Sequence, residues 1–194
     1  MSEIKFPIYL DHHATTPVDP RVLDEMIPYF TEKFGNASSL DHTFGYDASV
    51  AVENAREIIA NGIGARHDEI VFTSGATESD NIALIGTMNK YADRGNHLIT
   101  CVTEHKAVLD TAKHLESLGK KVTYLPVNEY GEINLQELEN AITSETVMIS
   151  IMFANNEIGT IADLKSIGEI AHKHELIFHT DAAQAVGHIP VDVG

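Results

Sequence analysis

Between residues 69 and 179 the sequence alternates between short apolar runs and longer segments of helical spacing, and this alternation restricts the possible folds. Short apolar runs indicate strands, whereas apolar residues three or four positions apart indicate helices. The expected strands span residues 69–73, 97–102, 121–127, 146–153 and 176–179, and the helices between them span 78–91, 106–118, 135–142 and 162–174. Strands separated by helices of this length form parallel βαβ units with right-handed crossovers. The sequence therefore predicts an α/β fold with a mainly parallel sheet.

The pattern also indicates which strands are central and what precedes them. Val71-Phe72 and the run Val-Met-Ile-Ser-Ile at 147–151 are apolar on both faces. Strands of this kind lie inside a sheet that helices cover on both sides. The expected upstream elements are a short apolar run at 8–10, a helix at 20–30 with Asp19 as N-cap, a loop at 35–45 and a helix at 47–63.

Composition narrows the classes of protein and of partner. The chain has 194 residues, 43% of them hydrophobic, which suits one packed domain or most of one. Its net charge of −16 argues against nucleic acid or an anionic membrane as a partner. The single cysteine, Cys101, allows no disulfide within the chain and fits a reducing compartment. The first residues are polar, and no apolar segment approaches the roughly 18 residues of a membrane span, so we expect a cytoplasmic protein.

The segment 72–79 (Phe-Thr-Ser-Gly-Ala-Thr-Glu-Ser) passes from an expected strand through a tight turn into a helix. Unpaired N–H groups and the helix dipole stabilise an anion at such a helix start. Gly75 would let a phosphate approach the backbone, and Thr77 would add a hydroxyl. The alternative is an ordinary helix start capped by Ser74 or Thr77.

Three further polar groups follow expected strands. His105 has the position to stack on a ligand ring or move protons, although a surface histidine is the alternative. Asn155 and Asn156 suit either a ligand contact or a turn. Asp181 is placed to keep a pyridine nitrogen protonated, with Gln184 nearby to reach a ring hydroxyl; a helix N-cap is the alternative for Asp181.

These groups are expected to meet at one edge of the sheet, because the carboxyl ends of parallel strands lie together and bind ligands. A phosphate cradle, an imidazole, an amide and a carboxylate suit a phosphorylated pyridine. Pyridoxal 5′-phosphate (PLP) is therefore the expected cofactor.

The ordered series of motifs resembles the N-terminal part of the cysteine desulfurases, and the resemblance extends over essentially the whole chain. The matching segments are YLD at 9–11, ATTP at 14–17, FGNASS at 34–39, SGATESDN at 74–81, TEHKAVL at 103–109, SIM at 150–152, NNEIG at 155–159, and Asp181-Ala182 with Gln184 and Val186-Gly187. This family has the large domain of the aspartate aminotransferase-like PLP enzymes (fold type I). Its members are usually homodimers with the active site close to the dimer interface.

The resemblance implies conversion of L-cysteine to L-alanine, with sulfur passed as an enzyme persulfide toward iron–sulfur cluster assembly or tRNA thiolation. A scaffold or another sulfur-acceptor protein would then be a partner. The implied contacts are Ala76 and Thr77 with the phosphate, His105 with the ring face and with transferred protons, Asn156 with the ring hydroxyl or substrate carboxylate, Asp181 with the ring nitrogen, and Gln184 with the ring oxygen. His105 is thereby the expected catalytic residue. Selenocysteine lyases, another branch of this fold, remain open.

Two residues essential to the family are not found in this sequence. The PLP lysine follows the Asp-Ala-x-Gln motif in a Ser-x-His-Lys stretch, and the persulfide cysteine lies further on, whereas the sequence ends at Gly194. Cys101 falls inside an expected strand and is expected to be a core thiol. We therefore expect an N-terminal segment plus most of the PLP-binding large domain over 1–194, without the C-terminal small domain. Such a chain would bind PLP weakly and be inactive alone, as a fragment, a split gene product or a truncation.

Two other functions compete with this hypothesis. The first is non-enzymatic: a truncated module of the PLP fold that acts as a subunit or a decoy. In either case the expected protein partner is a second copy of the chain or a complementary C-terminal chain. Alternatively, Asp11-His12-His13 resembles the Asp-His-His motif of a manganese-dependent phosphoesterase family. That family needs further ligands on other strands, some of them before the motif, and only ten residues precede Asp11. We therefore expect no metal site.

Overall fold

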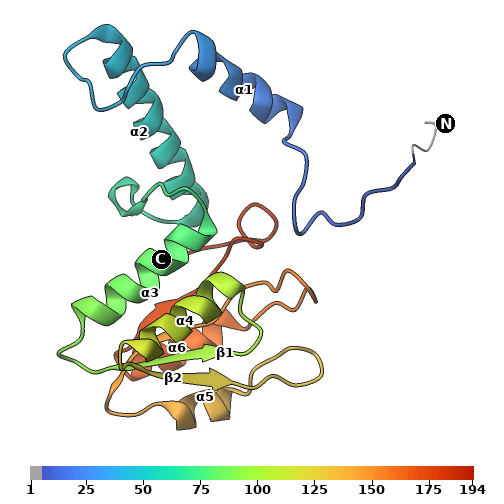
Figure 1. Ribbon diagram of the computed structural model, residues 1–194, viewed down its shortest axis with the longest axis vertical. Coiled ribbons are helices and arrows are strands. Elements are labelled where there is room, and N and C mark those ends of the chain that lie inside the picture. The colour runs from blue at the N-terminus through green and yellow to red at the C-terminus, as the bar shows by residue number, and fades with distance from the viewer. Residues whose placement is uncertain (1–5) are drawn as a thin grey trace. The chain divides into compact units, whose positions relative to one another are not determined.

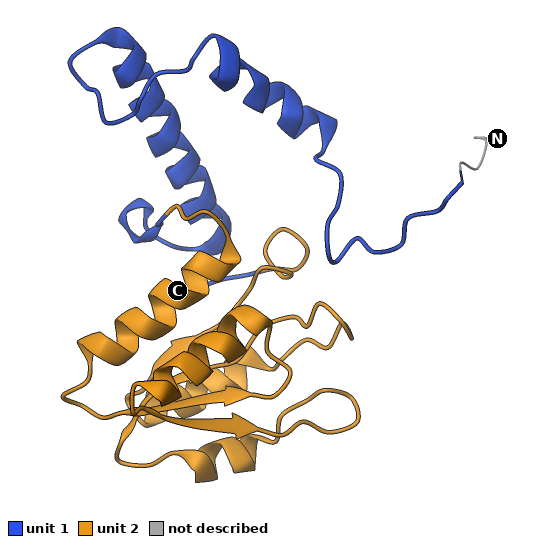
Figure 2. Ribbon diagram, viewed as in Figure 1, with its two compact units in different colours: residues 1–71, 191–194 blue, residues 72–190 orange. Residues whose placement is uncertain are grey.

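The computed structural model describes residues 6–194 (Figure 1). The chain forms two compact units (Figure 2): residues 1–71 with 191–194, and residues 72–190. The polar residues 1–5, which contribute to the expectation of a cytoplasmic protein, lie outside the described residues.

The unit of residues 72–190 contains a four-stranded parallel sheet, which confirms the predicted α/β fold. Its strands are β1 (His97–Cys101), β2 (Lys121–Leu125), β3 (Thr146–Ser150) and β4 (Ile177–His179), in the spatial order β2-β1-β3-β4. Every residue of β1 and β3 is buried, as expected for central strands.

Helices cover both faces of this sheet, as the sequence predicted. They are α3 (Ala76–Lys90), α4 (Lys106–Ser117), α5 (Leu135–Ala141) and α6 (Leu164–Lys173). Successive strand residues point to opposite faces. Leu98 of β1 and Met148 of β3 therefore pack with residues of α3 and α4, whereas Ile99 and Ile149 pack with residues of α5 and α6.

The layer between the sheet and helices α5 and α6 is expected to be sensitive to the loss of one methyl group. Ile149→Val should lower the free energy of unfolding by about 0.5–1.5 kcal/mol, because the Ile149 side chain is fully buried. Ile82→Val provides a matched control on α3, since Ile82 is 54% exposed and its change should stay within about 0.5 kcal/mol. Urea unfolding measures both values, and equal losses would contradict this packing.

The predicted strand at 69–73 is wrong. Residues 67–69 form a short 3-10 helix, η1 (His67–Glu69), and residues 70–73 do not belong to the four-stranded sheet. Val71 is 72% exposed and Phe72 is 48% exposed, although their apolar character suggested a central strand. A strand needs a neighbour for its N–H and C=O groups, and local sequence does not reveal whether one is present.

Element boundaries also differ from the prediction. Strand ladders end at Cys101, Leu125 and Ser150, before the predicted ends at 102, 127 and 153, and residues 8–10 form no strand. Helix α3 starts at Ala76 instead of residue 78. Differences of this size are usual where a strand passes into a turn.

The unit of residues 1–71 and 191–194 contains α1 (Pro20–Thr31) and α2 (Thr43–Ile63). Asp19 caps α1 by accepting the N–H of Arg21 at 2.9 Å, as predicted. Helix α2 begins inside the predicted loop 35–45, because His42 Nδ1 accepts the N–H of Gly45 at 3.1 Å and caps it. Within residues 6–194, no helix combines the length and the apolar character needed to cross a membrane.

Candidate cofactor site at the strand ends

The strand order places the turns that carry the predicted site residues side by side. The chain moves from β1 to β2 on one side, and β3 then pairs with the other side of β1. Ligands of open α/β sheets bind outside the carboxyl ends of the strands at such a reversal. The turns that follow β1, β3 and β4 contain His105, Asn156 and Asp181, respectively, and they emerge from the same end of the sheet (Figure 1).

The N-terminus of α3 is the predicted phosphate cradle. Gly75 is its N-cap, and no side chain within the described residues caps the helix there, so the predicted alternative of a Ser74 or Thr77 cap is wrong. Gly75 has φ 157° and ψ 177°, a conformation that is essentially restricted to glycine. A Cβ added at Gly75 would meet no atom within 4 Å, so the helix start faces open space. Ala76 and Thr77 are exposed in the first turn.

A chain of hydrogen bonds ties this first turn to α4. Asn81 Nδ2 donates to the backbone oxygen of Thr77 at 2.7 Å, and Thr111 Oγ1 donates to Asn81 Oδ1 at 2.9 Å. Thr77, Asn81 and His105 line one open hollow of about 320 Å³. The structure therefore places two predicted cofactor residues, Thr77 and His105, at the same hollow.

His105 is exposed, and it caps α4. Its Nδ1 accepts the backbone N–H of Ala107 at 3.1 Å. In the neutral imidazole the proton therefore lies on Nε2, because one ring nitrogen accepts while the other donates. His105 is a surface residue, as the alternative interpretation expected. Its ring is nevertheless held in place by the hydrogen bond from the Ala107 N–H.

The two adjacent asparagines take different roles. Asn155 Oδ1 accepts the N–H groups of Glu157 and Ile158 at 2.9 and 3.1 Å, so Asn155 forms the predicted alternative, a turn. Asn156 is half-buried, and its Nδ2 lies 3.2 Å from Glu157 Oε1. The turn made by Asn155 thus presents Asn156 at the end of β3.

Asp181 is buried two residues after β4. Its Oδ1 accepts the N–H of Ala183 at 2.9 Å, and its backbone oxygen accepts the N–H of Phe153 at 2.9 Å. Within residues 182–194 no α-helix follows, so the alternative of a helix N-cap is wrong. Gln184 is exposed in the turn that follows.

Three titratable residues near Asp181 had no predicted role: the buried Asp80 and Glu104, and the half-buried His179. His179 Nε2 lies 3.7 Å from Asp80 Oδ1, and His179 Nδ1 is 2.9 Å from Ser150 Oγ. For Asp80 a signal was present, because it occupies the buried stripe of α3 four residues before Leu84.

Burial governs the protonation of this group of side chains. Loss of solvent, with a further contribution from the Asp181 charge, raises the pKa of Asp80 to about 7. Burial likewise raises the pKa of Glu104 to about 7, and it lowers the pKa of His179. The pKa of Cys101 rises to about 11 through burial and the nearby Glu104, so Cys101 is the core thiol that the sequence predicted.

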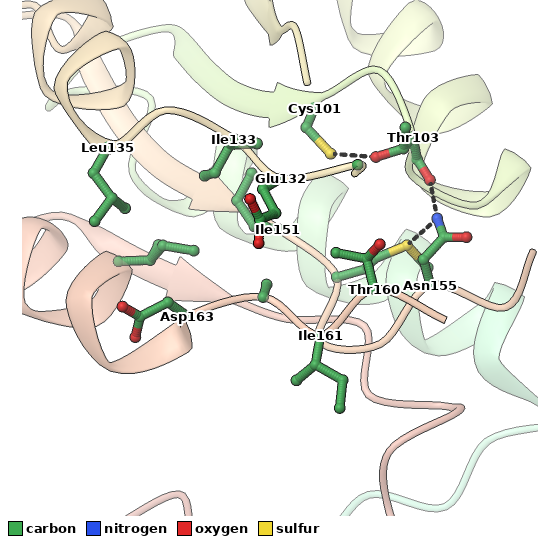
Figure 3. A pocket seen from close by; sticks show the side chains of 14 residues that line it. Cys101, Thr103, Glu132, Ile133, Leu135, Ile151, Asn155, Thr160, Ile161 and Asp163 are labelled. Atoms are coloured by element: carbon green, nitrogen blue, oxygen red, sulfur yellow. Dashed lines mark hydrogen bonds between the residues drawn. The ribbon is translucent and has the colours of Figure 1, made fainter. Parts of the chain in front are cut away.

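A separate cavity of about 200 Å³ lies beside the ends of β1 and β3 (Figure 3). Its lining includes Cys101, Ile151, Leu135 and Asn155. It includes none of the residues expected to contact the cofactor, which are Ala76, Thr77, His105, Asn156, Asp181 and Gln184. Cofactor pockets usually enclose about 300–1,000 Å³, so this cavity is too small for a phosphorylated pyridine. The strand-end turns, and not this cavity, are the candidate cofactor site.

The contacts of the Asp-His-His motif include two local ones. His13 Nε2 lies 3.2 Å from Asp11 Oδ1, and His12 Nδ1 lies 3.0 Å from Thr16 Oγ1. Residues 6–194 contain no group of three or more His, Cys, Asp or Glu side chains arranged to hold a metal ion. The further ligands that a manganese-dependent phosphoesterase needs are not gathered around Asp11 in this part of the chain.

The profile of the family Aminotransferase class-V matches residues 8–194, and the chain therefore belongs to this family. Members of the family use PLP. The cysteine desulfurase IscS of Neisseria meningitidis serogroup C, serotype 2a, is 58% identical over 190 residues, which cover 98% of this chain and 47% of that protein. The cysteine desulfurase IscS of Rickettsia massiliae is 52% identical over 193 residues, which cover 100% of this chain and 47% of that protein.

Solved structures agree with this similarity. A NifS-like protein superposes with a TM-score of 0.92 at 44% identity, covering 96% of this chain and 51% of that chain. The structure of SspA in complex with cysteine gives a TM-score of 0.91 at 44% identity, covering 95% and 53%, respectively. The chain thus spans about half the length of the relatives it matches.

The site residues fit PLP on structural grounds. The uncapped start of α3, with open space at Gly75, suits a phosphate group. The buried carboxyl group of Asp181 at the neighbouring strand end suits a pyridine nitrogen. The family's cofactor is therefore compatible with the groups that this chain presents.

Proposed function

We propose that residues 1–194 supply the N-terminal segment and most of the PLP-binding large domain of a cysteine desulfurase. The reaction is the conversion of L-cysteine to L-alanine, with the sulfur passed on as an enzyme persulfide. Two observations support this proposal most strongly. The turns that carry His105, Asn156 and Asp181 follow β1, β3 and β4 at one end of the sheet, and Thr77 in the first turn of α3 lines the same hollow as His105. The similarity to proteins named cysteine desulfurase selects this reaction among those of the family.

Each residue has a distinct role in this proposal. Bound PLP supplies an electron sink for the α-carbon of the substrate. Ala76 and Thr77 bind its phosphate with the free N–H groups of α3, and Asp181 keeps the ring nitrogen protonated. His105 stacks on the ring and moves protons through Nε2, because Nδ1 is engaged with Ala107.

Two amide side chains complete the proposed contacts. Asn156 contacts the ring hydroxyl or the substrate carboxylate from the turn after β3, and Gln184 contacts the ring oxygen from the turn after Asp181. Both side chains belong to turns fixed by backbone hydrogen bonds, since Asn155 holds the first turn and Asp181 holds the second. Neutral amides at these positions recognise oxygen atoms without competing with Asp181 for the ring proton.

The partners follow from the same proposal. L-cysteine is the substrate, and a scaffold protein for iron–sulfur clusters or a tRNA-thiolation protein accepts the sulfur. The protein works as a homodimer or together with a complementary C-terminal chain, in the cytoplasm. Neither nucleic acid nor a membrane is a partner, which is in keeping with the net charge of −16.

The decisive experiment supplies L-cysteine to the PLP-treated protein that contains this chain and measures alanine and sulfide. Equal amounts of both products are expected in the presence of a thiol reductant, which releases the persulfide sulfur. L-selenocysteine tested in parallel distinguishes a selenocysteine lyase. Bound PLP without alanine formation from either substrate would identify a non-catalytic subunit, and bound manganese with phosphoester hydrolysis would overturn the proposal.

Thr77→Val is expected to weaken PLP binding about three- to tenfold, because one hydrogen bond to the phosphate is lost while side-chain volume is kept. Absorbance titration of the cofactor-free protein with PLP measures the change. Thr87→Val, on the same helix but away from its N-terminus, is the control and should leave the dissociation constant unchanged. Equal affinities for PLP in both variants would remove Thr77 from the phosphate site.

A further inference from the structure

The carboxyl group of Glu104 bridges two strand ends. It follows β1, yet its Oε1 accepts the backbone N–H of Met152, beyond the end of β3, at 2.8 Å. Glu104 is only 5% exposed, and its Oε1 also accepts a hydrogen bond from Cys101 Sγ at 3.3 Å. A buried carboxyl group that accepts a hydrogen bond from a backbone N–H group far away in the sequence fixes the distance between two segments of the chain.

Asn155 makes the reciprocal connection. Its Nδ2 donates to the backbone oxygen of Thr103 at 2.9 Å, as Figure 3 shows, while its Oδ1 holds the turn that follows β3. One side chain from each turn thus bonds to the backbone of the other turn. We name the two contacts, Glu104 with Met152 and Asn155 with Thr103, the strand-end latch.

The latch lies where the sheet no longer holds these segments together. The ladder pairs of β1 and β3 end at Ile99 and Ile149. His105 and Asn156 are six and seven residues beyond the last pair, respectively, counted from 99 to 105 and from 149 to 156. Between these points, side chains must replace ladder hydrogen bonds if the two turns are to keep a fixed separation.

We propose that Glu104 and Asn155 are positioning residues, and that their latch fixes His105 relative to Asn156 so that both reach the same cofactor. This inference rests on the proposed function of the site. Neither residue needs to touch PLP, because each acts through a turn that carries a contacting residue. The family similarity assigns contacts to Asn156 and His105, whereas the latch explains why their neighbours are polar.

Burial favours the protonated form of Glu104 in the latch. Its Oε2 is buried and has no hydrogen-bond partner within the described residues, so a proton there is less costly than a charge. The titratable groups facing it are Cys101 on β1, Asp80 on α3 and Asp181 after β4, and none of them is a cation. A glutamine side chain therefore reproduces the state that the latch needs.

The first test uses Asn155→Asp in the protein that contains this chain. Aspartate keeps the Oδ1 atom that holds the turn, but it has no N–H group to donate to Thr103. Its second carboxylate oxygen would then lie opposite the backbone oxygen of Thr103. We expect the imidazole NMR resonances of His105 in the cofactor-free protein to shift and the PLP dissociation constant to rise about tenfold. Asn134→Asp is the matched control, because Asn134 only caps α5 through its Oδ1, at 2.8 Å from the Gln136 nitrogen.

The second test compares two changes at Glu104. Glu104→Gln keeps an acceptor for Met152 and should leave the His105 resonances and PLP affinity within about twofold of the unchanged protein. Glu104→Ala removes the acceptor and should shift the resonances and weaken PLP binding at least as much as Asn155→Asp. If Glu104→Ala does not fold, Asn155→Asp decides alone, because Asn155 is only half-buried.

The proposal is overturned if Asn155→Asp leaves both the His105 resonances and PLP affinity unchanged. It is also overturned for Glu104 if the glutamine variant is as impaired as the alanine variant, since charge would then matter more than the acceptor. If the unchanged protein takes up no PLP, the proposed function fails, while the His105 resonances of the cofactor-free variants still test the latch.

Discussion

Asp181→Asn is expected to lower kcat for alanine formation from L-cysteine by about 10²- to 10³-fold in the PLP-saturated protein. The asparagine oxygen can still accept the N–H of Ala183, which now holds Asp181 Oδ1 at 2.9 Å, so the turn is preserved. The neutral amide cannot hold a proton on the ring nitrogen, and the electron sink weakens accordingly. Initial rates at saturating L-cysteine measure the loss.

Asp192→Asn is the matched control for this change. Asp192 Oδ1 accepts the N–H two residues ahead, from Gly194, at the same distance of 2.9 Å, but Asp192 is exposed and belongs to the other unit. Its kcat should remain within about twofold of the unchanged protein. A kcat for Asp181→Asn that is also within this range would mean that Asp181 does not pair with the ring nitrogen.

The second large effect is on stability in the cofactor-free protein. Asp80→Asn should become more stable relative to the unchanged protein by roughly 2–4 kcal/mol as the pH rises from about 4 to about 7. The pKa of Asp80 is raised from 3.8 to about 7 in the folded protein. Over this interval the folded protein therefore keeps a proton that the unfolded chain has lost, and the stability of the unchanged protein falls as the pH rises.

The asparagine side chain does not titrate in this pH range. The difference in unfolding free energy between the two proteins therefore reports the pH dependence that comes from Asp80. Urea unfolding at several pH values measures it. Asp93→Asn, at an exposed aspartate, should show a difference that does not change with pH by more than about 0.5 kcal/mol. A pH-independent difference for Asp80→Asn as well would mean that Asp80 is ionised in the folded protein.

The features predicted well from the sequence depend on local patterns. Apolar runs located β1, β2, β3 and β4, because strand and helix periodicities differ and the intervening segments are long enough for crossovers. Polar residues after those runs predicted the candidate site, because parallel strands end at one edge. The failed strand at 69–73 shows the limit, since pairing depends on neighbours that are distant in the sequence.

The titratable residues near Asp181 show a second limit. Glu104 and His179 lie close in sequence to predicted site residues, but only the packed structure reveals that Glu104 is buried and His179 half-buried. Likewise, the residue pattern offered Asn155 and Asn156 as equivalent amides, and only the family resemblance singled out Asn156. The bond from Asn155 Nδ2 to the Thr103 oxygen could not be predicted, because that contact joins positions 52 residues apart.

The strand order has a consequence for synthesis on the ribosome. Each strand after β1 pairs with one that has already been made: β2 and β3 with β1, and β4 with β3. The sheet can therefore grow as the chain emerges, without waiting for a downstream partner. The turns bearing His105, Asn156 and Asp181 are completed in that same order, so the turn with Asp181 is the last of the three to form.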